Sequence, residues 1–465
     1  MISFLGALAL LLLGYLVYGT LVEKVFGAEA DRSTPCHTKE DGVDFVPMPT
    51  WKVFLIQFLN IAGAGPIFGA IMGIMYGPAA YLWIVLGCIF AGAVHDYMVG
   101  MISVRKGGAS LPEIVGDELG LLMRYAMRLC SLVLLVLCGV VFVRTPADLL
   151  HTMVSASSVW FWVVLIFCYY VLATLLPIGT LIGRIYPLFG AALLIMALGL
   201  CVGIFCHPGW MPEITDPLTG NHPAGNPVFP MLFITIACGA ISGFHGTQSP
   251  LMARCLMNER KGRLVFYGSM ITEGVVALVW AAATIKFAGS YDAIAAMGTP
   301  GVIVKTICSS WMGTVGAVLA VLGVVAAPVT SGDTCFRSAR LIAADFMHFD
   351  QRKVWHRLVL SLPMFAVAVV LMFVDFNVLW RYFGWFNQTL ATIGLWTATV
   401  WLSRSGRCYW LTLMPALFMT VVCTCYILVA TEGFELSMPV GISAGLGAMA
   451  VLGGAFFVWR LRKKD

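Results

Sequence analysis

Long apolar runs alternate with short polar segments along almost the whole chain. A helix needs about 20 predominantly apolar residues to cross the hydrocarbon core of a bilayer, and most of these runs reach that length. The pattern predicts an all-α polytopic membrane protein with about 13 transmembrane helices. The predicted spans are residues 2–22, 51–76, 80–102, 122–143, 158–176, 184–206, 229–248, 264–287, 312–332, 355–374, 378–402, 408–430 and 438–459.

The composition agrees with a surface that faces lipid. The chain has 465 residues, of which 60% are hydrophobic and 11% charged, and its mean hydropathy is +0.91. Soluble domains carry about 25% charged residues. The net charge of +5 is spread over many loops, so no nucleic-acid partner is expected. Most of the 14 cysteines lie inside apolar runs, where a thiol behaves as a small hydrophobe, and we expect neither a metal site nor a cofactor.

Lysine and arginine are distributed unevenly between the two sets of loops that 13 spans create. The loops on one side carry 24 of the 28 basic residues, and those on the other side carry four. A wrong number of spans would mix the two sets. Because cytoplasmic loops are enriched in Lys and Arg, the rich side is predicted to be cytoplasmic. The N-terminus is then outside, and the C-terminal segment "RLRKKD" is inside.

Two of the predicted spans contain glycine clusters that are unfavourable inside a continuous helix. Residues 51–76 carry "NIAGAGPIFGA" and residues 229–248 carry "TIACGAISGFHG". Gly and Pro interrupt a helix, although small residues also let membrane helices pack closely. The two clusters lie five spans apart, so their helices cross the membrane in opposite directions. This arrangement predicts two inverted units of five helices, a 5+5 inverted repeat in which each unit begins with a discontinuous helix.

The inverted units define the predicted organisation of the chain. The first five-helix repeat covers residues 51–206 and the second covers residues 229–403. Residues 1–22 form an additional N-terminal transmembrane helix, because they lack the positively charged start of a signal peptide and exceed the length of its apolar core. Residues 408–463 form two additional C-terminal transmembrane helices.

A break in the middle of a span exposes polar backbone groups that can bind a solute. The N-terminal end of a half-helix is partly positive and suits a carboxylate, whereas free carbonyl groups suit a cation. The two breaks together predict a site for a small anionic or zwitterionic solute near the middle of the membrane. The candidate substrate-binding residues are Gln57, Asn60, Gly63, Ala64, Gly65, Pro66, Gly239, Ser242, Gly243 and His245.

Ionisable residues inside the predicted spans are candidates for ion coupling, because a charge at this depth is costly. A buried carboxylate or imidazole can carry a proton. Alternatively, the hydroxyl groups of Thr330 and Ser331, together with carbonyl groups at the first break, can hold Na⁺. The coupling cation is therefore H⁺ or Na⁺. The ion-coupling candidates are His95, Asp96, Glu273, Thr330, Ser331 and Asp333.

Several of these polar groups also have a purely structural interpretation. His95 and Asp96 can form a hydrogen-bonded patch near the cytoplasmic interface. Asp333 is expected at the cytoplasmic end of its span, where it can pair with Arg337 or Arg340. Amides inside membrane helices often join one helix to another by hydrogen bonds. The residues expected to serve helix packing or a gate are Asn387 and Gln388.

Five segments, in order along about residues 50–400, carry a resemblance to a known family. They read "QFLNIAGAGPIFGAIMG", "GAVHDYMVGMISVRKGGASLPEI", "FPMLFITIACGAISGFHGTQSPLMA", "TSGDTCFRSARLIAADF" and "FGWFNQTLATIGLW". They resemble the carbon starvation protein CstA family, in a form shorter than its longest members. The resemblance implies a secondary transporter of the inner membrane with a LeuT-like fold. Members of the family are associated with uptake of pyruvate or peptides driven by an ion gradient.

The sequence therefore predicts an ion-coupled secondary transporter that imports a small carboxylate such as pyruvate, or short peptides, by alternating access. The expected partners are the small-molecule substrate and the lipid bilayer, and the expected location is the bacterial inner membrane. The chain has no H-E-x-x-H or P-loop pattern, and we expect neither an enzyme nor ATP-driven transport. A non-transporting membrane sensor for the same solute is the alternative.

Overall fold

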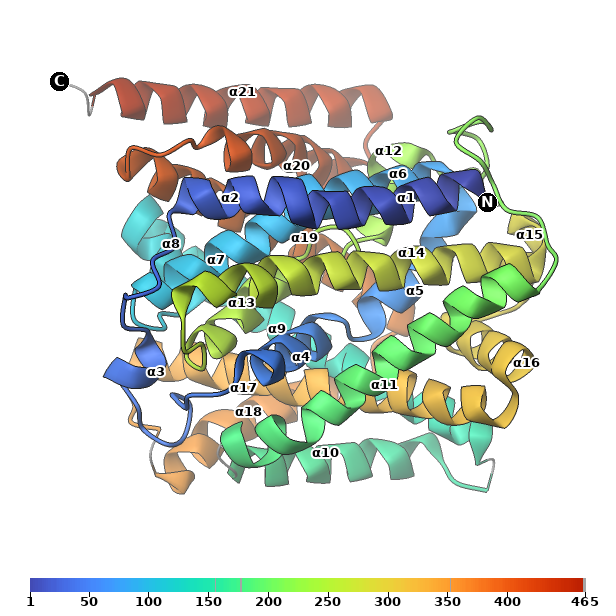
Figure 1. Cartoon of the computed structure of the whole chain (residues 1–465), viewed down its shortest axis with the longest axis horizontal. Coiled ribbons are helices and arrows are strands. Elements are labelled where there is room, and N and C mark those ends of the chain that lie inside the picture. The colour runs from blue at the N-terminus through green and yellow to red at the C-terminus, as the bar shows by residue number, and fades with distance from the viewer. Residues whose placement is uncertain (155, 176–177, 352, 463–465) are drawn as a thin grey trace.

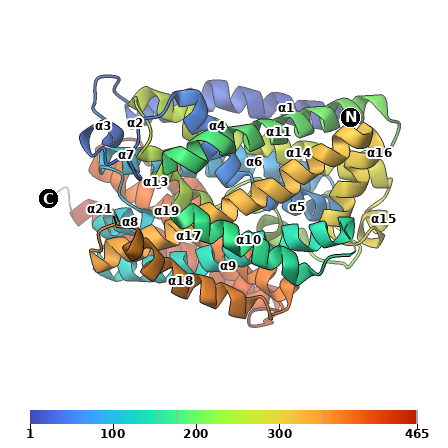
Figure 2. The same ribbon diagram turned by 90° about the horizontal axis from the view of Figure 1, so that it is seen from below.

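The computed structural model describes residues 1–462 except 155, 176–177 and 352, and these residues form a bundle of long α-helices. Figure 1 shows most of the long helices side by side, with their axes along one direction, and Figure 2 shows the same arrangement after a quarter turn. The first helix begins at one end of the bundle, and the last described helix ends at the other end (Figure 1). Helices satisfy their backbone hydrogen bonds internally, as a bilayer requires.

The first half of the chain begins with a rod made of two helices. α1 (Ile2–Leu13) and α2 (Gly19–Phe26) are joined by a π-helical turn at Gly14–Tyr18. The helices that follow are α3 (Pro35–Thr38), α4 (Thr50–Ile61), α5 (Ala64–Gly73), α6 (Ala79–Gly87), α7 (Ala93–Arg105), α8 (Leu111–Leu119), α9 (Leu121–Met153), α10 (Val159–Leu175) and α11 (Ile178–Cys206).

The second half begins after a loop rich in Pro, Gly and Asn, a composition that disfavours helix. Its helices are α12 (Val228–Thr235), α13 (Gly243–Ala253), α14 (Ser269–Ala288), α15 (Tyr291–Ala296), α16 (Pro300–Val321), α17 (Ala327–Met347), α18 (Val354–Leu371), α19 (Phe376–Arg404), α20 (Trp410–Val429) and α21 (Met438–Arg462). α17 packs against α9, and α20 packs between α19 and α21. Apolar side chains fill the space between the helices in one large core and in a smaller cluster shared by α9, α10, α17 and α18.

Nine helical segments in the described part of the chain are long and apolar enough to cross a membrane, and the bent pair α4 and α5 makes a tenth. The protein is therefore a multi-pass membrane protein. Three further predicted spans are also helical, but in each of them the continuous apolar helix is short or is interrupted. α10 has 17 residues, the span 229–248 is divided into α12 and α13, and α19 carries Asn387 and Gln388 in its middle.

The predicted boundaries of the span 312–332 are wrong at both ends. The structure has α16 beginning at Pro300, with a kink at Gly313, where φ is +57°. Only glycine adopts this backbone conformation readily, so the kink fits its residue. A π-helical turn at Leu322–Ala326 then leads into α17, which continues to Met347.

The three polar residues expected at the end of that span lie instead inside α17, where they are buried. The hydropathy pattern ended the span too early because Arg337 and Arg340, about two to three turns before the end of the helix, are themselves buried. Arg337 donates to the carbonyl oxygen of Ala173 (3.1 Å) and Arg340 donates to Gln351 Oε1 (2.6 Å). Arginines that are buried and hydrogen-bonded to other parts of the chain do not mark a membrane boundary. The residues whose position is corrected are Thr330, Ser331 and Asp333.

Candidate functional site

The first helix break separates α4 from α5, at the position that the glycine cluster predicts. The axes of the two helices differ by 48°. Ala62 and Gly63 have non-helical backbone angles, and α5 starts at Ala64. Pro66 falls in the first turn of α5, where its missing N–H group would have no partner within the helix. The proline therefore begins a new helix rather than damaging an existing one.

The second break is longer and covers residues 236–242, between α12 and α13. Two neighbouring side chains of α19 hold its two ends. Asn387 Oδ1 accepts hydrogen bonds from Ser242 Oγ (2.9 Å) and from the backbone N–H of Phe244 (2.7 Å), so it caps the start of α13. Gln388 Nε2 donates to the carbonyl oxygen of Phe233 (3.0 Å), near the end of α12. The amide pair in α19 thus fixes both halves of the broken helix.

The two breaks contact each other directly. A Cβ atom on Gly65 would lie 2.4 Å from Sγ of Cys238, inside the second break. A Cβ atom on Gly69 would lie 2.9 Å from the carbonyl oxygen of Thr235, the last residue of α12. Gly65 and Gly69 are one turn apart on the same face of α5. The small residues therefore allow the start of α5 to touch the interrupted backbone of the second broken helix.

Four ionisable residues from three helices form one buried group, and all four side chains are 0% exposed. His95 Nδ1 and Asp96 Oδ1 on α7 are 2.9 Å apart. His245 Nδ1 on α13 is 2.9 Å from Asp96 Oδ2. His245 Nε2 is 3.4 Å from Glu273 Oε2 on α14. Two imidazoles and two carboxyl groups are thus arranged in one chain of contacts, which we call the buried charge relay.

The imidazole of His245 occupies the central position in the buried charge relay. One of its ring nitrogens faces Asp96 and the other faces Glu273. An imidazole can accept a proton on one nitrogen and release a proton from the other. The contact with Asp96 has hydrogen-bond length, whereas the contact with Glu273 is longer and is not a hydrogen bond. A proton transfer between the two carboxyl groups would therefore require the Glu273 and His245 side chains to move closer together. His245 lies with this relay, one turn beyond the second break.

A second polar group joins α17 to the first break. Ser331 Oγ donates to the carbonyl oxygen of Leu59 (3.1 Å), in the last turn of α4. Thr330 Oγ1 donates to Ala327 within its own helix (2.8 Å). Asp333 accepts from the hydroxyl group of Tyr186 on α11 (2.7 Å), a partner that the structural interpretation did not include.

Two amides near the first break have hydrogen-bonding capacity that the described residues do not use. Asn60 is 0% exposed, and neither atom of its amide group has a hydrogen-bond partner. Gln57 Nε2 donates to Ser249 Oγ (3.3 Å), but its Oε1 atom has no partner. Buried polar atoms are nearly always satisfied, so these unused amide atoms make the first break a candidate position for a polar ligand.

The polar groups lie close to π-helical turns. Such turns precede α7 at Cys88–Gly92, α14 at Arg263–Gly268 and α17 at Leu322–Ala326. Each turn lies within about two helical turns of a candidate ion-coupling residue. π-Helical turns are rare and are frequent at functional sites, because the extra residue changes the direction of the side chains that follow.

Sequence reasoning missed two residues that complete these groups. Ser249 on α13 bonds to Gln57 and donates to the carbonyl oxygen of His245 (3.0 Å), so it connects the first break with the buried charge relay. Tyr186 on α11 holds Asp333. The position of Ser249, four residues after His245 on one helix, was the available signal. Tyr186 comes from a distant helix, and nothing in the local pattern indicates its contact.

The fold resembles that of solved transporters. The structure of a manganese transporter from Eremococcus coleocola, in complex with an aromatic bis-isothiourea compound, aligns with a TM-score of 0.56 over 92% of this chain and 99% of that chain. The sequences are 12% identical, so the likeness concerns the fold alone.

Curated relatives are similar in sequence. An uncharacterized membrane protein of Haemophilus influenzae is 45% identical over 62% of this chain and 91% of its own length. A peptide transporter CstA of Campylobacter jejuni is 31% identical over 66% of this chain. The pyruvate/proton symporter BtsT of Escherichia coli is 28% identical over 63% of this chain. The alignments span 54% and 50% of the lengths of these two transporters.

The functional names among these relatives are those of transporters, which supports the expected non-enzymatic role. A model of the family described as "Carbon starvation protein CstA" matches residues 1–157, 132–306 and 282–426. These matches cover most of the chain and include both helix breaks and the buried charge relay. The chain therefore belongs to the carbon starvation protein CstA family.

Proposed function

We propose that the chain is an ion-coupled secondary transporter that imports a small carboxylate or a short peptide by alternating access. The observation that carries this proposal is the direct contact between the two helix breaks, with the buried charge relay one turn away. A solute and a proton would then occupy adjacent sites. The names of the relatives, a peptide transporter and a pyruvate/proton symporter, support the same class of substrate.

The proposed solute site lies at the start of α5. The first turn of a helix presents free N–H groups and a partial positive charge, both of which suit a carboxylate. Asn60 and Gln57 provide the unused amide atoms beside this helix end. At the second break, the Asn387 side chain already accepts hydrogen bonds from Ser242 and from the first turn of α13. We therefore assign solute binding mainly to the first break, and the second break forms the opposite wall.

The proposed coupling ion is a proton carried by the buried charge relay. A Na⁺ ion held by Ser331, Thr330 and carbonyl groups of α4 is the alternative, because Ser331 already contacts the carbonyl oxygen of Leu59. Oxygen ligands of this kind are typical of hard cations. The two assignments differ in which gradient drives uptake, and they use different helices.

The proposed architecture has 13 spans in a LeuT-like 5+5 arrangement. Residues 51–206 and 229–403 form the two inverted units, and residues 1–22 and 408–463 add one and two helices. The N-terminus is proposed to face outside and the C-terminal end the cytoplasm of a bacterium. Two observations support this topology. An odd number of spans agrees with the opposite ends reached by α1 and α21 (Figure 1), and the basic residues are concentrated on one side.

Reconstituted uptake tests the proposal. The full chain is inserted into proteoliposomes, and uptake of labelled pyruvate and of labelled alanyl-alanine is measured with an imposed pH gradient, with an imposed Na⁺ gradient and with neither. We expect the pH gradient to stimulate uptake of at least one probe. Stimulation by Na⁺ alone would move the coupling site to Ser331. Absence of stimulated uptake for both probes would contradict transport and favour a solute sensor.

A further inference from the structure

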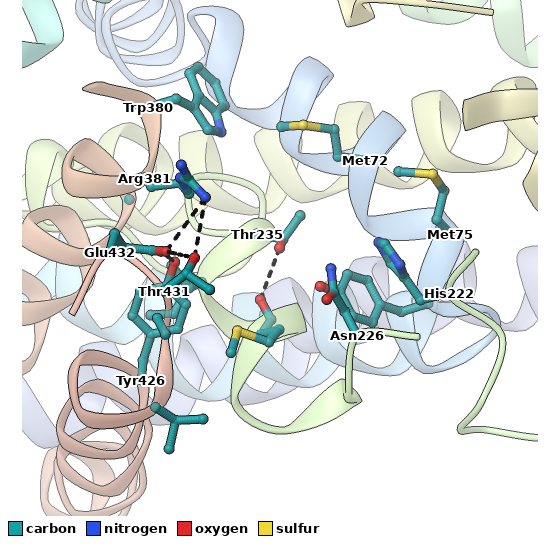
Figure 3. A pocket seen from close by; sticks show the side chains of 16 residues that line it. Met72, Met75, His222, Asn226, Thr235, Trp380, Arg381, Tyr426, Thr431 and Glu432 are labelled. Atoms are coloured by element: carbon teal, nitrogen blue, oxygen red, sulfur yellow. Dashed lines mark hydrogen bonds and ion pairs between the residues drawn. The ribbon is translucent and has the colours of Figure 1, made fainter. Parts of the chain in front are cut away.

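A cavity of about 560 Å³ lies beside the loop that binds the start of the chain. Its location follows from its lining, which includes His222 and Asn226 from the same loop whose Glu213 binds the N-terminal amino group. Figure 3 shows Arg381, Thr431 and Glu432 on one wall and Met72, Met75 and His222 across from them. In the proposed topology this is the outer end of the protein.

The cavity reaches the second helix break. Ile234 and Thr235, the last two residues of α12, line it, and so does Gly384, which lies one turn before Asn387 on α19. A solute that enters the cavity would therefore contact the residues that directly precede the second break. In the proposed topology, the cavity therefore lies between the outer solution and the contact between the two breaks.

Arg381 is the cation of this cavity. Burial lowers the pKa of the His222 imidazole below its usual value, so His222 is neutral around pH 7. Arg381 is one of four basic residues on the predicted outer side, and its side chain is 43% exposed. Arg144, another of the four, has both oxygens of Asp148 within 3.2 Å of its Nε atom. Arg381 makes no comparably close pair in the described structure.

The guanidinium group of Arg381 is held loosely. Its Nη1 atom is 3.8 Å from Glu432 Oε2 and 3.4 Å from Thr431 Oγ1. Glu432, in contrast, is 6% exposed and is bound by the hydroxyl groups of Tyr426 and Thr431. A carboxylate with other partners can release an arginine at little cost. Arg381 has five N–H donors in a fork that matches two carboxylate oxygens.

We propose that Arg381 forms an outer binding site that captures the carboxylate group of an incoming solute, which then replaces Glu432 as the partner of the guanidinium group. This inference rests on the proposed function for the direction of entry, but the binding site itself does not require transport. The other side chains that line the cavity can adapt to solutes of different shapes. Met72, Met75 and Met231 are flexible and polarizable, and aromatic rings add apolar surface.

Equilibrium binding to the purified full chain in detergent tests the proposal. The probes are labelled pyruvate, labelled alanyl-alanine and labelled alanyl-alanine amide, which lacks the carboxylate. We expect Arg381→Gln to weaken binding of at least one carboxylate probe by about tenfold or more, because a hydrogen bond to a charged group is lost. The control is Arg32→Gln, since Arg32 is also 43% exposed beside a single carboxylate and is placed outside the cavity. Its affinities should equal those of the wild type.

A second variant is expected to change the binding affinity in the opposite direction. Glu432→Gln removes the competing carboxylate and should strengthen binding of the same probe by up to about fivefold. The amide probe should respond to neither variant. Wild-type affinity in Arg381→Gln, weaker binding in Glu432→Gln, or no binding of either carboxylate probe to the wild type would overturn the proposal. If binding depends on Arg381 but proteoliposomes show no gradient-driven uptake, the transport proposal fails and the binding site stands.

Discussion

The two helix breaks have similar glycine clusters but different surroundings. At the second break, Asn387 and Gln388 of α19 bind the facing ends of α12 and α13. At the first break, Gly63 precedes α5 and has no side chain with which to cap it. The adjacent Asn60 amide is buried and unpartnered in the described structure. Both ends of the second break are thus hydrogen-bonded to α19, although Gln388 Oε1 has no partner in the described structure. At the first break, neither atom of the Asn60 amide has one.

This difference assigns different tasks to two elements that look alike in sequence. Hydrogen bonds at both ends of a segment restrict its conformation, whereas an unpaired buried amide carries a free-energy cost that a ligand can remove. We therefore propose the first break as the position of the solute. The second break provides a fixed wall and places His245 on α13 within reach of Asp96 and Glu273. The following variants are expected to separate the two tasks.

The largest effect is expected from Gly65→Leu. A side chain here would collide with Cys238, whose Sγ atom lies 2.4 Å from the position of a Cβ atom. The breaks would be forced apart, and uptake in proteoliposomes should fall below about a tenth of the wild-type rate, since overpacking of this kind costs about 1–3 kcal/mol. Gly454→Leu is the control, because no atom lies within 4 Å of a Cβ at Gly454. Normal uptake by Gly65→Leu would remove the contact between the breaks from the account.

Glu273→Gln should uncouple uptake from the pH gradient. The substitution keeps the shape of the side chain but removes the carboxylate that faces His245 Nε2. Stimulation by an imposed pH gradient should disappear, while exchange of labelled for unlabelled solute continues. Glu435→Gln, in an exposed position between α20 and α21, should behave as the wild type. An unchanged response of Glu273→Gln to the gradient would exclude Glu273 from proton transfer.

Asn387→Ala is expected to act mainly on stability. It removes the cap of α13 and leaves Ser242 Oγ and the Phe244 N–H group without their acceptor. Loss of such a cap costs about 0.5–2 kcal/mol, and thermal unfolding in detergent should begin at a lower temperature. Gln388→Ala should have a smaller effect, because a single bond is lost. An unchanged melting temperature for Asn387→Ala would contradict the scaffold role of the second break.

The smallest effect is expected from Ser331→Ala. The substitution removes one hydrogen bond to the carbonyl oxygen of Leu59, which is worth about 1 kcal/mol. If a proton drives transport, uptake under a pH gradient should remain within about twofold of the wild type. Loss of a Na⁺-stimulated component in this variant would instead place the coupling ion between α4 and α17.

The sequence predicted much of the helical arrangement because the signals were local. The glycine clusters located both breaks, and the apolar runs located most helices to within a few residues. The boundaries failed at α17, where arginines are buried by partners that are distant in sequence. Hydropathy treats every arginine as exposed, so it ended the span too early.

The sequence predicted where the candidate site lies better than it predicted which residues contact one another there. His95, Asp96, His245 and Glu273 were each identified as unusual for their depth, but the pattern does not show that Asp96 lies between the two histidines. That contact joins residues 149 positions apart. The outer cavity was missed for the same reason. Arg381 belongs to α19 and Glu432 to the turn after α20, and their proximity follows from the packing of α20 against α19.

The assignment of solute binding to the first break is tested most directly by Asn60→Ala. Its melting temperature in detergent and its equilibrium affinity for labelled pyruvate and alanyl-alanine are measured beside those of Asn387→Ala. We expect Asn60→Ala to keep the wild-type melting temperature, because its amide has no partner to lose, and to bind the transported probe about tenfold more weakly. Wild-type affinity in Asn60→Ala, together with a lower melting temperature, would contradict the account.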